Sequence, residues 1–152
     1  ILYPALEPAC GEGHIAKLLD ESQTISSDLI DRGYGGIDDY LNGQQSYSGI
    51  RTVITNPPFS LFQEFVEKSL KVASDKVIMF GKLQALEGNK RATYLQTTPL
   101  KYIYVFKKRQ QPLRNGSNID PLTGKTMASS TMAFAWFVWE KDFEGEPIVR
   151  WL

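Results

Sequence analysis

The tetrapeptide Asn56-Pro57-Pro58-Phe59 combines residue types that suit one kind of chemistry. The Asn56 side chain offers a carbonyl oxygen, and the backbone carbonyl of Pro57 has a fixed direction because the rings of Pro57 and Pro58 restrict the backbone. Phe59 supplies a flat apolar face. Two hydrogen-bond acceptors beside a stacking wall would bind a planar group that carries an NH2, such as the exocyclic amine of adenine. The purely structural alternative is a rigid strand-to-helix connector.

A glycine turn stands earlier in the chain, where Gly11, Gly13 and Ala16 fit the G-x-G-x-x-A pattern of dinucleotide-binding loops. Such turns also begin helices in proteins that bind nothing, so the pattern alone is weak. Two carboxylates strengthen it. Glu7 lies just before the turn, and Asp28 follows the next predicted strand, where it could accept both hydroxyls of an unphosphorylated ribose. NAD and S-adenosylmethionine both remain candidates at this point.

The charge distribution predicts an anionic partner, although the whole chain is neutral. Residues 1–76 carry 6 basic and 11 acidic residues, whereas residues 77–152 carry 11 basic and 6 acidic residues. The excess of positive charge lies mainly between Lys82 and Lys125. A solvated loop is the alternative to phosphate contact there. The predicted nucleic-acid-binding residues are Lys107, Lys108, Arg109 and Arg114.

Composition excludes several classes of protein and of site. The 152 residues, 42% of them hydrophobic, suit one globular domain, and no apolar run approaches the roughly 20 residues of a membrane-spanning helix. Cys10 is the only cysteine and His14 the only histidine, so we expect no disulfide, no metal site and a reducing, cytoplasmic compartment. Cys10 lies inside the glycine turn, which disfavours a role as nucleophile. Because the sequence begins at Ile1, we expect a trimmed or incomplete chain.

Strands that alternate with helices are expected to position these groups. The pattern predicts a mainly parallel sheet with helices on both faces, in one domain over residues 1–152. A long basic loop is expected over residues 107–130. The predicted strands cover residues 1–6, 23–28, 51–55, 76–80, 101–106 and 131–140, and the predicted helices lie near 15–19, from 60 to about 70, and over 83–95 with a break near Gly88.

The two motifs together resemble a known family. Residues 6–13 (LEPACGEG) followed by residues 55–59 (TNPPF) resemble the S-adenosylmethionine-dependent amino-methyltransferases, most closely the DNA adenine-N6 methyltransferases of phage, prophage or restriction–modification type. The resemblance extends through residues 27–35, 39–41 and 134–140, and therefore covers nearly the whole chain. It implies an α/β, Rossmann-like methyltransferase fold with a mainly parallel sheet and a final antiparallel strand, which residues 131–140 would supply.

The resemblance also implies roles for single residues. Glu7 and the turn would hold the methionine end of S-adenosylmethionine, and Asp28 would take the ribose. Asp39 would bind the adenine amino group of the cofactor, and Tyr40 would flank that ring. The catalytic residues would be Asn56, Pro57, Pro58 and Phe59, which grip and stack on an extruded base. The cofactor-binding residues would be Glu7, Pro8, Ala9, Cys10, Gly11, Gly13, Asp28, Leu29, Asp39, Tyr40 and Asn56.

This chain departs from the family pattern in two ways. Only ten residues separate Asp28 from Asp39, so the third-strand edge of the sheet should be abbreviated, and Asp38 is an alternative to Asp39 at the cofactor. There is also no obvious target-recognition domain, so the sequence does not indicate a recognition site. The resemblance implies DNA as the partner, with RNA, a homodimer and a partner specificity subunit as alternatives. Methylation of an RNA base or a glutamine amide, and an inert nucleic-acid-binding subunit, are the alternatives; NAD chemistry shares only the glycine turn.

Overall fold

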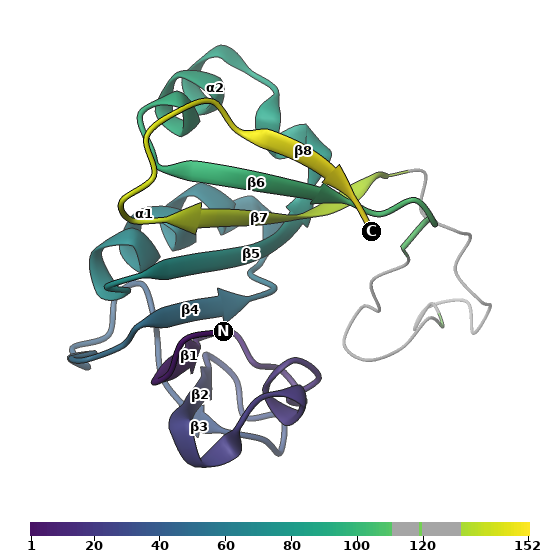
Figure 1. The fold of residues 1–152 in the computed structure, drawn as a ribbon. Helices are drawn as coiled ribbons and strands as arrows, with labels where there is room; N and C mark the ends of the chain where they lie inside the picture. Colours follow the sequence, from purple (N-terminus) through teal and green to yellow (C-terminus); the bar gives the residue numbers. More distant parts are fainter. Residues whose placement is uncertain (111–118, 120–131) are drawn as a thin grey trace.

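The computed structural model describes residues 1–110, 119 and 132–152, which form one eight-stranded sheet (Figure 1). The strand order is β3-β2-β1-β4-β5-β7-β6-β8. The strands are β1 (Ala5–Glu7), β2 (Thr24–Asp28), β3 (Gly36–Ile37), β4 (Thr52–Thr55), β5 (Lys76–Lys82), β6 (Leu100–Val105), β7 (Phe134–Glu140) and β8 (Ile148–Trp151). The helices are α1 (Phe62–Val72) and α2 (Asn89–Gln96), with 3₁₀ turns at Ala16–Leu18, Glu21–Gln23, Phe59–Leu61 and Leu83–Leu86.

The sheet is mainly parallel. Strands β1 to β5 pair in parallel, whereas β7 runs antiparallel between β5 and β6. Strands β1 and β4 are buried at every residue and read as continuous apolar or Thr-rich runs, which is typical of central parallel strands. The parallel pairing brings the carboxyl ends of β1, β2 and β4 to one edge of the sheet. The predicted antiparallel strand and abbreviated third-strand edge are both confirmed, because β3 has only two residues.

Helix α1 covers one face of the sheet through Phe62, Phe65 and Val66, which are buried in the main core. The ring of Phe62 packs against Phe137 of β7 at a centroid distance of 5.3 Å. Gly81 of β5 lies beneath it, and a Cβ at this glycine would come within 2.5 Å of the Phe62 ring. A glycine in β5 therefore leaves room for the Phe62 ring of the helix.

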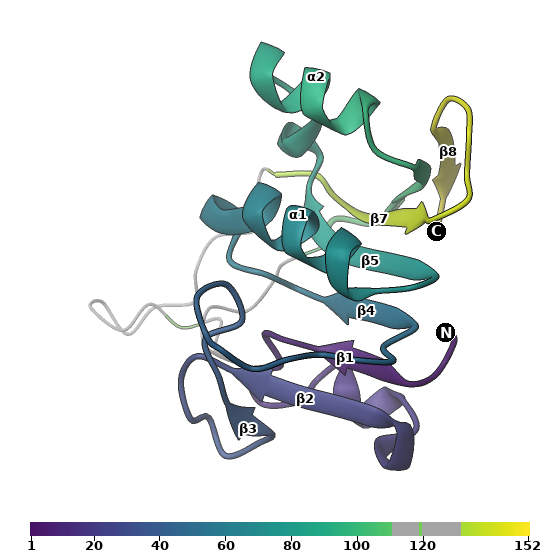
Figure 2. The same ribbon diagram turned by 90° about the vertical axis from the view of Figure 1, so that its left-hand side faces the viewer.

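The prediction of helices on both faces is wrong for the described residues. Helices α1 and α2 lie on the same face (Figure 2). Between β1 and β2 there are only short 3₁₀ turns instead of the predicted helix near residues 15–19, and Leu18 is 84% exposed there. With a glycine turn at one end and the capped turn at Asp20 at the other, the segment holds only single turns. The apolar spacing of this segment therefore did not reflect a buried helical stripe.

Strand β8 was not predicted from the sequence. It pairs in parallel with β6, and all four of its residues are exposed. Because neither of its faces is buried, the hydrophobic pattern gives no period-2 signal. It extends the sheet beyond the predicted antiparallel strand. Among the described residues, no helix has both the length and the apolar character needed to span a bilayer.

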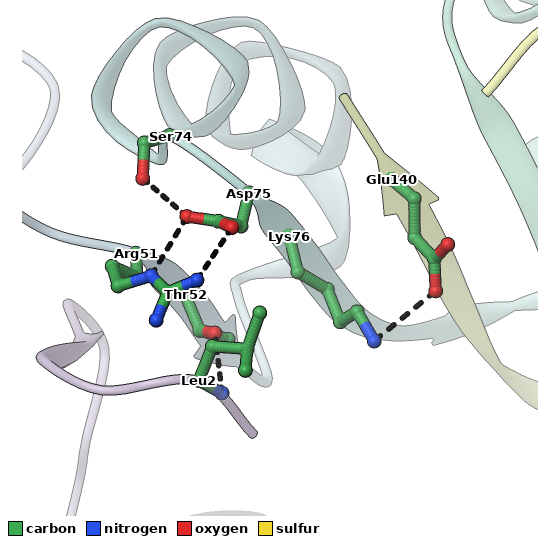
Figure 3. A network of polar contacts seen from close by, with 7 residues as sticks. All are labelled: Leu2, Arg51, Thr52, Ser74, Asp75, Lys76 and Glu140. Carbon is green, nitrogen blue, oxygen red and sulfur yellow. Dashed lines mark hydrogen bonds and ion pairs between the residues drawn. The ribbon is translucent and has the colours of Figure 1, made fainter. Parts of the chain in front are cut away.

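The amino-terminal edge of the sheet, opposite the carboxyl ends of β1, β2 and β4, carries a network of paired charges (Figure 3). Asp75 accepts two hydrogen bonds from the Arg51 guanidinium, at 3.0 and 2.9 Å, and this guanidinium lowers the pKa of Asp75 to about 2. Glu140, the last residue of β7, forms ion pairs with Lys76 at 3.1 Å and with Lys101 at 2.6 Å. These pairs connect β4, β5, β6 and β7 at the sheet edge opposite the carboxyl ends of β1, β2 and β4.

Candidate functional site

One cavity of about 630 Å³ opens at the carboxyl ends of β1, β2 and β4. It brings together segments that are far apart in the sequence: the turn after β1, the end of β2, the segment around residues 38–42 and the tetrapeptide after β4. Every predicted catalytic and cofactor-binding residue except Gly13 lies in its wall. Those wall residues are Glu7, Pro8, Ala9, Cys10, Gly11, Asp28, Leu29, Asp39, Tyr40, Asn56, Pro57, Pro58 and Phe59.

The glycine turn is built by two glycines with positive φ, 55° at Gly11 and 80° at Gly13. The Gly11 N–H donates to Oδ2 of Asp28 at 2.9 Å, so the turn and the end of β2 hold each other in place. Gly13 does not line the cavity. A Cβ there would lie 2.6 Å from the Tyr34 ring, which means that packing against Tyr34, rather than approach of a ligand, requires this glycine.

Asp28 is the last residue of β2 and is held by two backbone N–H groups. Besides Gly11, the N–H of Ile30 donates to its Oδ1 at 3.1 Å. Each carboxylate oxygen keeps further acceptor capacity toward the cavity. Leu29 and Ile30 follow it in the cavity wall, and they are 63% and 55% exposed. The end of β2 therefore presents a hydrogen-bond acceptor next to apolar surface, which suits a hydroxylated ring attached to a flat one.

Glu7, the last residue of β1, is only 1% exposed and its Oε2 has no hydrogen-bond partner among the described residues. Its pKa is raised to about 8, first because burial disfavours the charged form and further because Asp28 is nearby; a hydrogen bond from the Ala16 backbone opposes the shift. Glu7 is thus a buried, protonated carboxyl group with one oxygen left unsatisfied in the cavity wall. A cation placed against it would favour the ionised form.

The segment after β3 supplies two carboxylates that are already engaged. Asp39 Oδ1 accepts the N–H groups of Leu41 and Asn42 at 3.2 and 3.1 Å, and the bonds from Asn42 lower its pKa. Asp38 accepts the hydroxyl of Tyr47. Both carboxylates lie in the cavity wall, so Asp38 and Asp39 both remain possible contacts for a ligand.

Tyr40 is mainly a core residue. It is 2% exposed, its hydroxyl bonds Ser69 at 2.9 Å, and its ring contacts Phe65 at a centroid distance of 5.3 Å. Burial raises the pKa of Tyr40 to about 12. Tyr40 belongs to the cavity wall, while its hydroxyl serves the packing of α1.

The tetrapeptide after β4 presents an amide without a partner. Asn56 is exposed, and within the described part of the chain its side chain forms no hydrogen bond. Pro57 is buried and Pro58 is exposed, which fixes the backbone between the strand and the turn Phe59–Leu61. The half-buried Phe59 ring rests on Phe134, with the two centroids 5.6 Å apart. A rigid backbone therefore holds the amide and the ring side by side in the cavity wall.

Two further predictions concern single residues. The Cys10 thiol is 4% exposed, and burial raises its pKa to about 11, which keeps it protonated at neutral pH and unsuited to nucleophilic attack. Of the predicted nucleic-acid contacts, Lys107, Lys108 and Arg109 follow β6, are exposed, and do not line the cavity. Arg114 lies outside the described residues.

The structure adds wall residues that sequence reasoning missed. Ile30 and Arg32 follow Asp28 closely, and Asn42 lies three residues after Asp39. Ile30 and Arg32 belong to a segment that the resemblance already covered, so proximity to Asp28 was the available signal. Asn42 had no such signal, because its place depends on the turn that Asp39 stabilises.

Comparison with known proteins gives fold-level matches. No protein-family model matches the chain, and no curated protein sequence does. Among solved structures, the chain is similar to a type I restriction–modification methyltransferase subunit from Streptococcus thermophilus, with a TM-score of 0.66 and 10% identity over 95% of this chain and 42% of that one. It is similar to the 23S rRNA methyltransferase ErmE, with a TM-score of 0.58 and 16% identity over 95% of this chain and 66% of that one.

A third likeness is to a Listeria monocytogenes protein described as a class I S-adenosylmethionine-dependent methyltransferase, with a TM-score of 0.55 and 12% identity over 97% of this chain and 58% of that one. The chain thus spans about two fifths to two thirds of the length of these proteins. Identities this low speak for the fold alone. The chain has the Rossmann-like fold of the S-adenosylmethionine-dependent methyltransferases.

Proposed function

We propose that this chain transfers a methyl group from S-adenosylmethionine to the exocyclic N6 amine of an adenine in DNA. One observation carries the proposal: a single cavity joins the Glu7–Asp28 end, which suits the cofactor, to the Asn56–Phe59 end, which suits a planar amine. A methyl donor and its acceptor must meet in one space, in line with the leaving sulfur. A nicotinamide cofactor would leave Asn56 to Phe59 without a role.

The residues at the first end fit the cofactor. Asp28 has spare acceptor capacity for ribose hydroxyls, and Leu29 and Ile30 offer apolar surface for the adenine ring. The unsatisfied Oε2 of Glu7 suits the positive charge of the methionine moiety. When bound, S-adenosylmethionine supplies a methyl group that the sulfonium has already activated. The chain then has to bind and orient the cofactor and the target, and to exclude water from the cavity.

The residues at the second end fit the target. The adenine amine is a weak nucleophile because its lone pair is delocalised into the ring. If the side-chain carbonyl of Asn56 and the backbone carbonyl of Pro57 accept its two hydrogens, they stabilise the positive charge that develops on nitrogen during attack. Phe59 would stack on the base after it leaves the duplex. The nitrogen would gain the methyl group as the sulfur leaves and would afterwards release one of its protons to solvent, so no general base is required before attack.

The likeness to a restriction–modification subunit supports DNA as the substrate and favours a separate specificity subunit as the partner. The likeness to ErmE keeps methylation of an RNA base as the second candidate. Both substrates are polyanions with exocyclic amines, and both agree with the excess of basic residues in the second half of the chain.

A side-by-side methyl-transfer assay tests the proposal. The purified chain is incubated with radiolabelled S-adenosylmethionine and, in separate reactions, unmethylated duplex DNA, single-stranded DNA, RNA or protein. Nucleoside analysis of labelled products then identifies the methylated base. We expect N6-methyladenine in DNA. Label in RNA alone or in protein alone would replace the proposal, and calorimetric titration with S-adenosylmethionine shows whether the cofactor site is competent in either case.

A further inference from the structure

Lys82 lies beside the aromatic wall of the cavity. It is the last residue of β5 and pairs with Phe134 across the β5–β7 ladder. The backbone just after it is fixed, because the Leu83 N–H donates to the Ala133 carbonyl at 2.9 Å. The half-buried side chain places its Nζ 5.0 Å from the centroid of the Phe59 ring. The ammonium group therefore stands at the ring on which a target base would stack.

In the part of the chain that the structure describes, this ammonium has no anionic partner. Among the described residues, no carboxylate lies within 4.0 Å of Lys82, and the aromatic ring is its one charge-stabilising contact there. Lys76, at the other end of the same strand and on the same face, instead forms a 3.1 Å ion pair with Glu140. A half-buried cation held over a ring is attracted only weakly compared with a cation that meets an anion. Lys82 is thus poised for a negative group that binds next to Phe59.

The chemistry of the target decides which anion that is. A nucleotide whose base stacks on Phe59 carries its own phosphates one sugar away from the ring. The flexible four-carbon stem of lysine lets the ammonium leave the ring and reach such a group. A glutamine side chain offers the same planar amide but brings no anion with it. The Asp28 carboxylate lies in the part of the cavity assigned to the cofactor, so a polyanion is repelled there and accepted at Lys82.

We infer that Lys82 binds the phosphate flanking the nucleotide that stacks on Phe59, and so selects a nucleic-acid strand over a protein amide as the methyl acceptor. This inference rests on the proposed function, since it requires a target at Phe59. It adds a binding residue outside the basic segment after β6. The contact is to the backbone of the strand and reads no sequence.

The test compares Lys82→Ala and Lys82→Gln with Lys82→Arg and with the matched control Lys76→Ala, which removes the same charge from the other end of β5. Affinity for a fluorescein-labelled, adenine-containing single strand is measured by anisotropy between 50 and 200 mM salt, and KM and kcat are measured on unmethylated plasmid DNA. Log affinity falls as log salt rises. Loss of one phosphate contact should make this fall less steep, by about 0.7 in the slope on the single strand.

For Lys82→Ala and Lys82→Gln we expect this lower slope, a several-fold higher KM for DNA and an unchanged kcat and cofactor affinity. Lys82→Arg should restore the salt slope, and Lys76→Ala should behave as the unaltered chain. The inference would be overturned if the unaltered chain methylates DNA and the Lys82→Gln variant has the same KM and the same salt slope. That result would leave the proposed function standing. Methyl transfer to a protein amide alone would overturn both.

Discussion

The two edges of the sheet treat their polar groups in opposite ways. At the amino-terminal edge, Asp75 is paired with Arg51 and Glu140 with two lysines. At the carboxyl-terminal edge, buried side-chain oxygens are left without partners in the described part of the chain. They belong to Glu7, Ser27 and Thr55, at or next to the ends of β1, β2 and β4.

Unsatisfied buried groups cost free energy, typically about 1–3 kcal/mol each, so their collection at one edge needs a reason. The paired edge contributes to the fold. At the unpaired edge Glu7 lines the cavity whereas Ser27 and Thr55 do not, so under the proposed function a ligand would bring a partner to Glu7 Oε2. Asn56 and Lys82 extend the same contrast to exposed and half-buried groups. The difference predicts that changes at the carboxyl-terminal edge affect chemistry and binding, while changes at the other edge affect stability.

Asn56→Ala should give the largest effect. Because it removes an acceptor that stabilises developing charge, we expect kcat for methyl transfer to fall by roughly 10²–10³. Cofactor affinity, measured by calorimetry, should fall far less than kcat, because Asn56 would be only one of many cofactor contacts and has no bond to the turn or to Asp28 among the described residues. Asn42→Ala is the matched control at the other end of the cavity, where the amide supports Asp39. It should weaken cofactor binding and leave kcat at saturating cofactor nearly unchanged; an active Asn56→Ala enzyme would contradict the assignment.

Asp28→Ala should mainly weaken cofactor binding. The substitution removes the acceptor for the Gly11 N–H and for the ribose hydroxyls together. Hydrogen bonds to charged groups contribute about 1.5–3 kcal/mol, so the dissociation constant should rise by roughly 10–150-fold. Asp28→Asn, which keeps one acceptor oxygen, should give a smaller rise. Equal affinity of the unaltered chain and Asp28→Ala in calorimetry would move the ribose site elsewhere.

Phe59→Ala should raise KM for DNA more than it lowers kcat. Stacking of a base on an aromatic ring contributes about 1–3 kcal/mol, equivalent to roughly 5–150-fold in affinity. A duplex with 2-aminopurine at the target position reports extrusion of the base by its fluorescence. We expect the signal to fall in Phe59→Ala and to return in Phe59→Trp. A full signal in the alanine variant would mean that Phe59 serves only its contact with Phe134.

Sequence reasoning predicted which residues meet in one cavity wall better than it predicted the layers of the fold. Glu7 and Asp28 end β1 and β2, Asn56 follows β4 directly, and parallel strands bring their ends to one edge. Local pattern therefore determined that Glu7, Asp28 and Asn56 would share a cavity wall. The 3₁₀ turn at Ala16–Leu18 and the exposed strand β8 were missed, because helical spacing does not require burial and an exposed edge strand has no apolar periodicity.

Contacts that depend on tertiary packing could not be predicted from the sequence either. Gly13 matches a ligand-binding pattern in the sequence, but Tyr34, 21 residues later, occupies the space beside it. The pairing of Lys82 with the Phe59 ring likewise depends on how β5 ends next to β4. Sequence patterns indicate which groups reach the edge of the sheet, whereas the choice of neighbour is set by packing between strands.

The last prediction concerns pH, because the two edges carry carboxyl groups whose pKa values are shifted in opposite directions. Glu7 has a pKa of about 8 in the folded chain against 4.5 for an ordinary glutamate, so the folded state binds the extra proton between these values. Its contribution to stability is therefore complete below pH 4.5 and is lost as pH rises toward 8. Asp75, at about 2 against 3.8, contributes above pH 3.8 and loses that contribution as pH falls toward 2.

Urea midpoints of the unliganded chain between pH 2 and 9 separate the two contributions. Glu7→Gln mimics the protonated carboxyl group, so its midpoint should exceed that of the unaltered chain by a margin that grows from pH 4.5 to pH 8. Asp75→Asn should have a lower midpoint than the unaltered chain at neutral pH, with a difference that fades below pH 3.8. Parallel pH profiles for Glu7→Gln and the unaltered chain would mean that the pKa of Glu7 is not raised in the folded state. The contrast between the two edges would then rest on the other unpaired groups.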